Sequence, residues 1–298
     1  MSYEKASCTP ERPDAAAVRI AAAVARTWYG QMSDQGSEVP LGVVATLAQV
    51  RSPQAGVDPA EQLLPLSPAR LWEVLERVWA RQWATHPELV HWARRVHGWL
   101  RQAPTEEQAK AVHAVVHTAL EAGLLELTDH ADAHARSATD VLGPLLSELR
   151  GISQVSAVGE YHSPPDVTAL AERLTAPDLP EPGAWLMDPV AGTGGMARAM
   201  ASRLREAGRG PEECAWYLIE VDAVAAACCA ANALVWHLGP HVLVQCADTL
   251  QNPDWKAALA ERQAVRARMD EALAAASLAS VTKSAAELLG SPPPFLHR

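Results

Sequence analysis

The second half of the chain alternates apolar runs with helical segments, and this alternation constrains the fold more than any other feature. Three short runs read as buried strands: GAWLMDPV, CAWYLIEVD and HVLVQCAD. The segments between them, GMARAMASRLREAG and AVAAACCAANALVWHLG, read as helices that are followed by glycine. Strands that alternate with helices form a parallel sheet with right-handed crossovers. We therefore predict an α/β fold with three adjacent parallel strands and two crossover helices.

The rest of the chain divides around this region. Residues 1–14 are predicted to be a disordered tail, and residues 15–150, which show only helical patterns, an all-helical domain. Residues 151–255 are predicted to form a Rossmann-like cofactor-binding domain, and residues 256–298 a helical extension rich in alanine and charge. No fourth apolar run follows Trp255, so we expect a shortened sheet whose first strand is an open edge. The terminal helix or another chain would have to cover that edge.

Composition limits the functional classes. The 298 residues carry a formal net charge of −10, which argues against a broad basic surface for nucleic acid but leaves room for a local groove or a basic partner. The five cysteines form no C-x-x-C pair, so zinc and disulfide frameworks are both disfavoured. The polar N-terminus lacks a signal core, and no apolar run has the ~20 residues of a membrane helix. We expect a soluble, cytoplasmic protein with reduced thiols.

Two patterns in the helical region admit a functional and a structural interpretation. Trp72 and Trp79 are seven residues apart, as are Trp92 and Trp99. Such a stripe could stack on bases, but the spacing favours packing between helices. His113 and His117 lie on one helical face, yet no H-E-x-x-H motif or convergent carboxylate accompanies them, so we predict no metal site.

The first strand ends in the turn DPVAGTGG, residues 188–195. Its glycines allow the backbone to approach a ligand closely and the following helix to pack tightly on the strand. The spacing is neither G-x-G-x-x-G nor a phosphate-binding P-loop. The turn opens with Asp188, which would repel a pyrophosphate and would suit a ligand that is cationic or rich in donors.

The second and third strands also end in acids. Glu220 closes the second strand, with Asp222 two residues later, and is placed to accept hydrogen bonds from two ribose hydroxyls. Asp248 closes the third strand and is placed to accept from an exocyclic amine. Each acid alone could be an ordinary helix N-cap. Together with the glycine turn they favour a nucleoside that carries an amino acid, which is S-adenosyl-L-methionine.

These elements resemble those of N6-adenine DNA methyltransferases, above all the modification subunits of type I restriction systems. DPVAGTGG resembles the family's DP-x-x-G-[ST]-GG element, and GEYHSP, residues 159–164, resembles its G-[EQ]-[FY]-[FY]-[TS]-P element. DVLGPLLSELRGI resembles the helix that precedes GEYHSP, IEVD the second-strand acid, and CADTL the third-strand element. His162 and Ala247 depart from the family pattern, which has an aromatic residue and glycine there.

The resemblance implies a Rossmann-like, S-adenosylmethionine-dependent methyltransferase domain behind the helical one. It places the ribose on Glu220, the adenine amine on Asp248 and the methionine portion on the first turn, under the GEYHSP segment. The implied cofactor-binding residues are Tyr161, Ser163, Pro164, Asp188, Pro189, Gly192, Gly194, Gly195, Glu220, Asp222 and Asp248.

The catalytic [NDS]-PP-[YF] loop of that family has no clear counterpart. Asn252 and Pro253 belong to NPDW, which follows Asp248 without an intervening strand, and we interpret it as a turn upstream of the true loop. SPPPF, residues 291–295, has one proline too many and follows a helical pattern. The chain thus resembles the cofactor-binding half of such an enzyme, truncated before the target-base half.

Three functions remain open. The chain could be an N6-adenine DNA methyltransferase, active alone or with a partner that supplies the missing loop. It could be a catalytically inactive regulatory or scaffolding protein with a methyltransferase fold. A small-molecule methyltransferase is disfavoured, because GEYHSP and DPVAGTGG point to the DNA family. Expected partners are DNA, reached through a complex, and a protein partner or second copy that covers the open edge.

Overall fold

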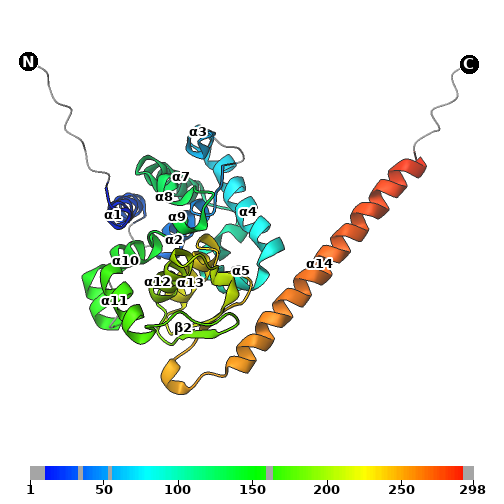
Figure 1. Cartoon of the computed structure of the whole chain (residues 1–298). Helices are drawn as coiled ribbons and strands as arrows, with labels where there is room; N and C mark the ends of the chain where they lie inside the picture. Colours follow the sequence, from blue (N-terminus) through cyan, green and yellow to red (C-terminus); the bar gives the residue numbers. More distant parts are fainter. Residues whose placement is uncertain (1–10, 33–35, 53–55, 159–163, 291–298) are drawn as a thin grey trace, which may run out of the picture.

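The computed structural model describes residues 11–32, 36–52, 56–158 and 164–290. Helices dominate the described chain, and the sheet is small and parallel, as the sequence predicts. Figure 1 shows the helices of the first half gathered on one side of this sheet, while the last helix extends away from both.

Helices account for all regular structure among the described residues up to 158. The longer ones are α1 (Pro13–Gln31), α2 (Glu38–Leu47), α4 (Pro68–Thr85), α7 (Glu106–Glu121) and α10 (Leu142–Val158). The short ones are α3 (Pro59–Leu63), α5 (Pro87–Trp92), α6 (Arg94–His97), the 3₁₀ helix η1 (Gly98–Arg101), α8 (Leu124–Thr128) and α9 (Ala133–Arg136). Ser67 caps α4 by accepting a hydrogen bond from Arg70 N at 3.5 Å, and Pro68 occupies the first turn, where its missing N–H costs no hydrogen bond.

The tryptophans of this region belong to the core. Trp72 and Trp79 are buried, and Trp72 meets Trp99 edge to face with ring centroids 5.0 Å apart. Trp79 stacks on His97 at 4.5 Å and donates its indole N–H to Thr46 Oγ1 at 2.7 Å. The interpretation that the tryptophan spacing serves packing between helices is therefore confirmed for Trp72 and Trp79.

The sheet contains β1 (Trp185–Asp188), β2 (Ala215–Glu220) and β3 (Val242–Cys246), all parallel and in the order β1-β2-β3. The crossover helices are α12 (Gly195–Glu206) and α13 (Ala223–Val235), and α11 (Pro165–Thr175) precedes the sheet. Two 3₁₀ turns, η2 (Pro211–Glu213) and η3 (Thr249–Gln251), flank β2 and β3. All three predicted strands are confirmed, although each is shorter than its apolar run because the flanking residues already turn.

The two faces of the sheet are covered differently. Trp216 and Leu218 of β2 join the main core, which continues through α13 into the first-half helices. Tyr217 and Ile219 face the other way and form a small second cluster with Leu243 of β3 and Ala258. One face therefore rests on a large core and the other on the first turns of the last helix.

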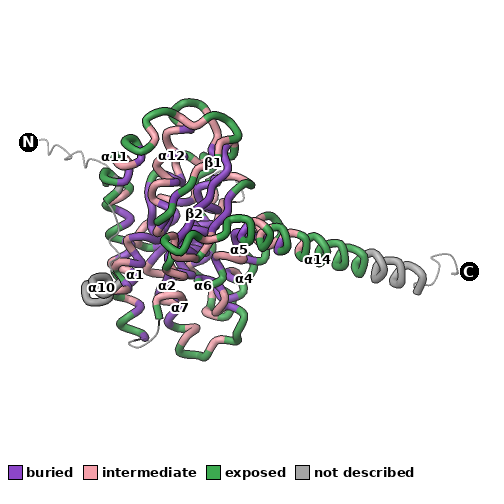
Figure 2. The backbone as a smooth tube through the Cα atoms, turned by 90° about the horizontal axis from the view of Figure 1, so that it is seen from below, coloured by how far each residue is buried: buried purple, intermediate pink, exposed green. Residues whose placement is uncertain are grey.

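The last helix, α14 (Trp255–Gly290), occupies most of the segment in which the sequence predicts a helical extension. It packs against α4, α5 and β3, and its far part is exposed where it leaves the body of the chain (Figure 2). Glu88 of α5 is buried and accepts from Arg266 at 3.0 Å, with Arg262 at 3.6 Å, so an ion-pair cluster fixes α14 on the β3 side.

At the opposite edge, β1 pairs with no strand except β2 among the described residues. The start of α14 approaches β1, where the rings of Trp185 and Trp255 lie 6.4 Å apart. The expected open edge is thus present in the described chain, and α14 takes the β3 side instead.

The predicted division at residue 150 falls inside α10, which runs on to Val158. The main core is also continuous from α1 to β3. The division into a helical and a cofactor-binding domain stays a prediction.

Candidate functional site

The carboxyl ends of the three strands meet in one place, as a parallel sheet requires. Ala191 N donates to Ile219 O at 2.8 Å, which ties the turn after β1 to the end of β2. Ala247 N donates to Glu220 O at 3.0 Å, and Thr249 Oγ1 donates to Pro189 O, so the end of β3 is tied to the other two. The structure therefore brings Asp188, Glu220 and the segment of Asp248 together at the carboxyl ends of the strands, beside the glycine turn.

The three glycines of that turn have two different roles. Gly192 has φ +54°, and a Cβ built on it meets nothing within 4 Å, so its surface is open to a ligand. Gly194 has φ +98°, and a Cβ there would lie 3.1 Å from Trp236 and 3.3 Å from Cys229 Sγ. Gly195 lies against Thr168, 3.3 Å from an added Cβ. One glycine thus leaves room for a ligand, and two allow α12 to pack closely.

Glu220 is buried and holds the turn in place. Its Oε2 accepts from Gly192 N at 2.8 Å, and its Oε1 accepts from Asp222 N at 2.9 Å. A carboxylate has about four acceptor sites, so each oxygen keeps one for a hydroxyl donor. The predicted contact with a ribose is compatible with this geometry, and Glu220 also links the first two strand ends.

Asp188 lies at the end of β1 and is buried. Burial raises the pKa of its carboxyl group above the ordinary value, and the nearby Glu220 carboxylate adds to the rise. The hydrogen bond that it accepts from Val190 N at 3.1 Å acts in the opposite direction and lowers this pKa. A buried acid next to a second acid is stabilised by a cationic or donor-rich ligand, which agrees with the expectation from the sequence.

Asp222 and Asp248 both act as helix caps. Asp222 Oδ1 accepts from Val224 N at 3.0 Å and Ala225 N at 2.7 Å at the start of α13. Asp248 Oδ1 accepts from Leu250 N at 2.9 Å in η3. Both acids therefore act as N-caps, which was the alternative role that the sequence left open. The second carboxylate oxygen of Asp248 remains available to another donor.

An arginine that the sequence reasoning missed reaches Asp222. Arg150 of α10 donates from Nη2 to Asp222 Oδ1 at 2.6 Å, and both side chains are largely buried. This ion pair joins the helix that leads toward GEYHSP to the end of β2. The two residues are 72 positions apart, so no local pattern signals the contact.

A second missed group is the buried Asp140, just ahead of α10. Its Oδ2 accepts from Thr193 Oγ1 at 2.6 Å, and its Oδ1 accepts from Asn232 Nδ2 at 2.9 Å. The same Nδ2 donates to Thr193 O at 2.9 Å. The only sequence signal was that an acid precedes a predicted helix, which by itself indicates a cap.

The remaining predicted residues are placed as follows. Tyr161 and Ser163 lie outside the described residues, and Pro164 is the N-cap residue of α11, close to Gly195 through Thr168. Asn252 is exposed with φ +49° and, with Pro253, forms the turn into α14, in line with our interpretation of NPDW. The SPPPF segment lies outside the described residues.

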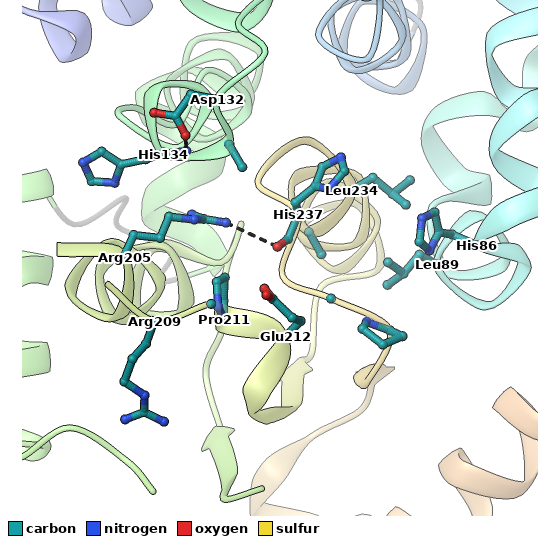
Figure 3. Close-up of a pocket in the computed structure, with 15 residues that line it drawn as sticks. His86, Leu89, Asp132, His134, Arg205, Arg209, Pro211, Glu212, Leu234 and His237 are labelled. Carbon is teal, nitrogen blue, oxygen red and sulfur yellow. Dashed lines mark hydrogen bonds between the residues drawn. The ribbon is translucent and has the colours of Figure 1, made fainter. Parts of the chain in front are cut away.

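A cavity of about 720 Å³ lies at the other end of the strands (Figure 3). Gly210 and Pro211 before β2 and Gly239 before β3 contribute to it, together with His237. Burial, followed by Arg136 and Arg51, lowers the pKa of His237 to about 4. Because this cavity adjoins the amino ends of β2 and β3, it is separate from the predicted cofactor residues.

Two further features concern function. Among the residues described by the structure, no group of three His, Cys, Asp or Glu side chains is arranged to hold a metal ion. His113 and His117 stack on each other at 4.3 Å, and His113 Nε2 lies 3.2 Å from Leu66 O.

None of the helices in the described parts of the chain is long and apolar enough to span a lipid bilayer.

The fold and the strand ends together define a Rossmann-like class of site, with a glycine turn on the first strand and acids on all three. Residues 145–275, from α10 into α14, match the family model of N-6 DNA methylases. The resemblance to N6-adenine DNA methyltransferases is thereby confirmed for this segment, and it supports a DNA methyltransferase function. A search of curated proteins found no match to the chain.

Proposed function

We propose that the chain binds S-adenosyl-L-methionine and contributes to methylation of adenine N6 in DNA, together with a partner chain. The observation that carries the proposal is the convergence of Asp188, Glu220 and Asp248 beside the open face of Gly192, inside the segment that matches the N-6 DNA methylase family.

The residues present fit this cofactor. Gly192 offers an open backbone surface, Glu220 retains acceptor capacity for a ribose, and Asp248 has an oxygen left for an amine. Asp188, whose charge is disfavoured by burial, suits the cationic methionine portion. When bound, the cofactor would supply an electrophilic methyl group on its sulfonium sulfur, which would pass directly to the target amine as the thioether leaves, so the protein's task is to orient the reactants.

The need for a partner is inferred from the β1 side of the sheet. An apolar groove of about 320 Å³ follows this edge, between β1, α11 and α12, and includes Leu186, Met196 and Met200. Met187 of β1, which contributes to the groove, is exposed, and α11 also exposes Val167 and Leu170. An unpaired strand edge beside apolar surface is suited to strand addition by another polypeptide. We propose a partner that supplies strands and the missing [NDS]-PP-[YF] loop.

A second candidate is a catalytically inactive scaffolding or regulatory protein. It is favoured by the exposed position of Asn252 in a turn before α14, and by the use of Asp222 and Asp248 as caps. In that case the glycine turn would serve packing alone, and the cofactor would not bind.

Calorimetric titration with S-adenosylmethionine separates the two candidates. We expect saturable binding at a single site, and we expect Asp248→Ala to weaken it by about tenfold or more because a charged acceptor is lost. The matched control is Asp254→Ala, which removes a similar exposed cap, from Lys256 N at 2.9 Å, at the start of α14. Equal loss of affinity in both variants would contradict the assignment of Asp248, and no binding to the unmodified chain would favour the scaffold.

Transfer of labelled methyl groups to unmethylated DNA then tests the partner. The chain alone should bind the cofactor without methylating DNA, because the described residues offer no acceptor loop at the β1 edge. Efficient methylation by the purified chain alone would remove the need for a partner.

A further inference from the structure

We infer that Asp140 is a positioning residue for the cofactor site, which fixes the glycine turn from the helical half of the chain. The inference rests on the proposed function, because it assumes that the turn binds the cofactor. It assigns a role to a residue outside the turn and outside the three strands.

The contacts converge on one buried carboxylate. Asp140 accepts four hydrogen bonds: from Leu142 N at 2.9 Å, Gly143 N at 3.1 Å, Asn232 Nδ2 at 2.9 Å and Thr193 Oγ1 at 2.6 Å. The first two cap α10, and the other two come from α13 and the glycine turn. Since a buried polar group is costly without partners, this network holds each member in one arrangement.

The turn needs such an anchor because its own backbone is permissive. Thr193 stands between Gly192 at φ +54° and Gly194 at φ +98°, and glycine occupies such conformations with little restriction. The Thr193 side chain is buried and is bound to Asp140, and its carbonyl is bound to Asn232. The only non-glycine residue at the centre of the turn is thus held at both its hydroxyl and its backbone.

The anchored turn is the surface that the cofactor would meet. Gly192 lies next to Thr193 and gives its N–H to Glu220, the predicted ribose acceptor. If the anchor is lost, the turn samples more conformations before binding, and ordering it reduces the affinity. Asp140 is itself placed by the helical half, where the adjacent Thr139 Oγ1 donates to Asp14 of α1 at 2.8 Å.

The test compares three threonine variants of the full chain by calorimetry with S-adenosylmethionine. Thr193→Val removes the hydroxyl and keeps the shape, and we expect the dissociation constant to rise about tenfold. Thr193→Ser retains the hydroxyl and should bind within about twofold of the unmodified chain. The control is Thr128→Val, since Thr128 is equally buried and gives its hydroxyl to Leu124 O at 3.0 Å, far from the turn in sequence. It should lower the melting temperature and leave the dissociation constant unchanged.

Asp140→Asn should reproduce the effect of Thr193→Val, and the two changes combined should weaken binding no more than either alone. Unchanged affinity in both single variants, or a loss in Thr193→Ser equal to that in Thr193→Val, would overturn the inference.

A measurement without cofactor keeps the two proposals distinguishable. Hydrogen exchange of the peptide over residues 188–196 should be faster in Thr193→Val than in Thr193→Ser and the Thr128→Val control. Faster exchange with no cofactor binding in the unmodified chain would refute the proposed function while retaining the anchor. Unchanged exchange would refute the anchor whatever the cofactor does.

Discussion

The two edge strands of the sheet, β1 and β3, differ in how far the rest of the chain buries their side chains. One row of side chains runs across all three strands, from Met187 through Tyr217 to Leu243. Leu243 on β3 is 2% exposed beneath α14, whereas Met187 on β1 is 58% exposed. The chain covers this face at β3 with its own helix and leaves it exposed at β1, which also borders an apolar groove. This difference supports the proposal of a partner at the β1 side.

The largest effect is expected when the side chains at the two ends of this row, Leu243 and Met187, are each shortened to alanine. Leu243→Ala should lower the free energy of unfolding by about 2–4 kcal/mol, because it leaves a cavity under α14. Met187→Ala should change it by less than about 0.5 kcal/mol, because most of that side chain is already in water. Urea unfolding of both variants gives the two values. A similar cost for both would mean that the β1 edge is covered in solution.

A second test addresses how α14 is fixed on the β3 side. Glu88→Gln should cost about 1–3 kcal/mol, because Arg262 and Arg266 then lose a buried carboxylate. The matched control is Glu261→Gln, because the Glu261 side chain is 45% exposed against 2% for Glu88, and it should cost less than about 1 kcal/mol. Thermal melting of the two variants decides the point, and equal shifts would show that Glu88 does not anchor the helix.

Sequence reasoning found the sheet because its signals are local. Each strand is a short apolar run followed by an acid, and each crossover helix is followed within a few residues by glycine, so the three strand ends and Asp188, Glu220 and Asp248 could be named in advance. The residues that hold the glycine turn in place could not be predicted in this way. Asp140 is separated in sequence by 53 positions from Thr193 and by 92 from Asn232, and contacts over such distances exist only once the chain has folded. The position of α14 on the sheet likewise depends on tertiary contacts, namely the ion pair of Glu88 with Arg266 and the second hydrophobic cluster.

A smaller effect is expected from a charge on the open edge. Met187→Lys should leave the unfolding free energy nearly unchanged and should raise the protein concentration at which the chain self-associates, because an exposed lysine blocks edge-to-edge pairing. Light scattering across a concentration series measures this. Arg268→Glu on the exposed part of α14 is a control for a general change of surface charge, and an equal effect there would show that β1 is not the associating edge.

Asp188 is the last residue of β1 and is buried at the end of the open strand. Burial, together with Glu220, raises the pKa of Asp188 in the folded chain above its unfolded value of about 3.9. The folded state therefore binds the proton more tightly, and the contribution of this group to stability is greatest at low pH and is lost as the pH rises through the folded pKa.

Asp188→Asn keeps an acceptor for Val190 N and removes the charge, so it should stabilise the chain slightly at neutral pH. The gain should shrink as the pH is lowered from a neutral to an acidic value, because the raised pKa leads the unmodified carboxyl to take up a proton in the folded chain. The same variant should bind S-adenosylmethionine more weakly, because a cationic ligand gains from the carboxylate that the folded chain itself disfavours. Urea unfolding at both pH values and a calorimetric titration give the three quantities. If the variant gained stability without losing affinity, Asp188 would be a strained strand end with no part in the cofactor site.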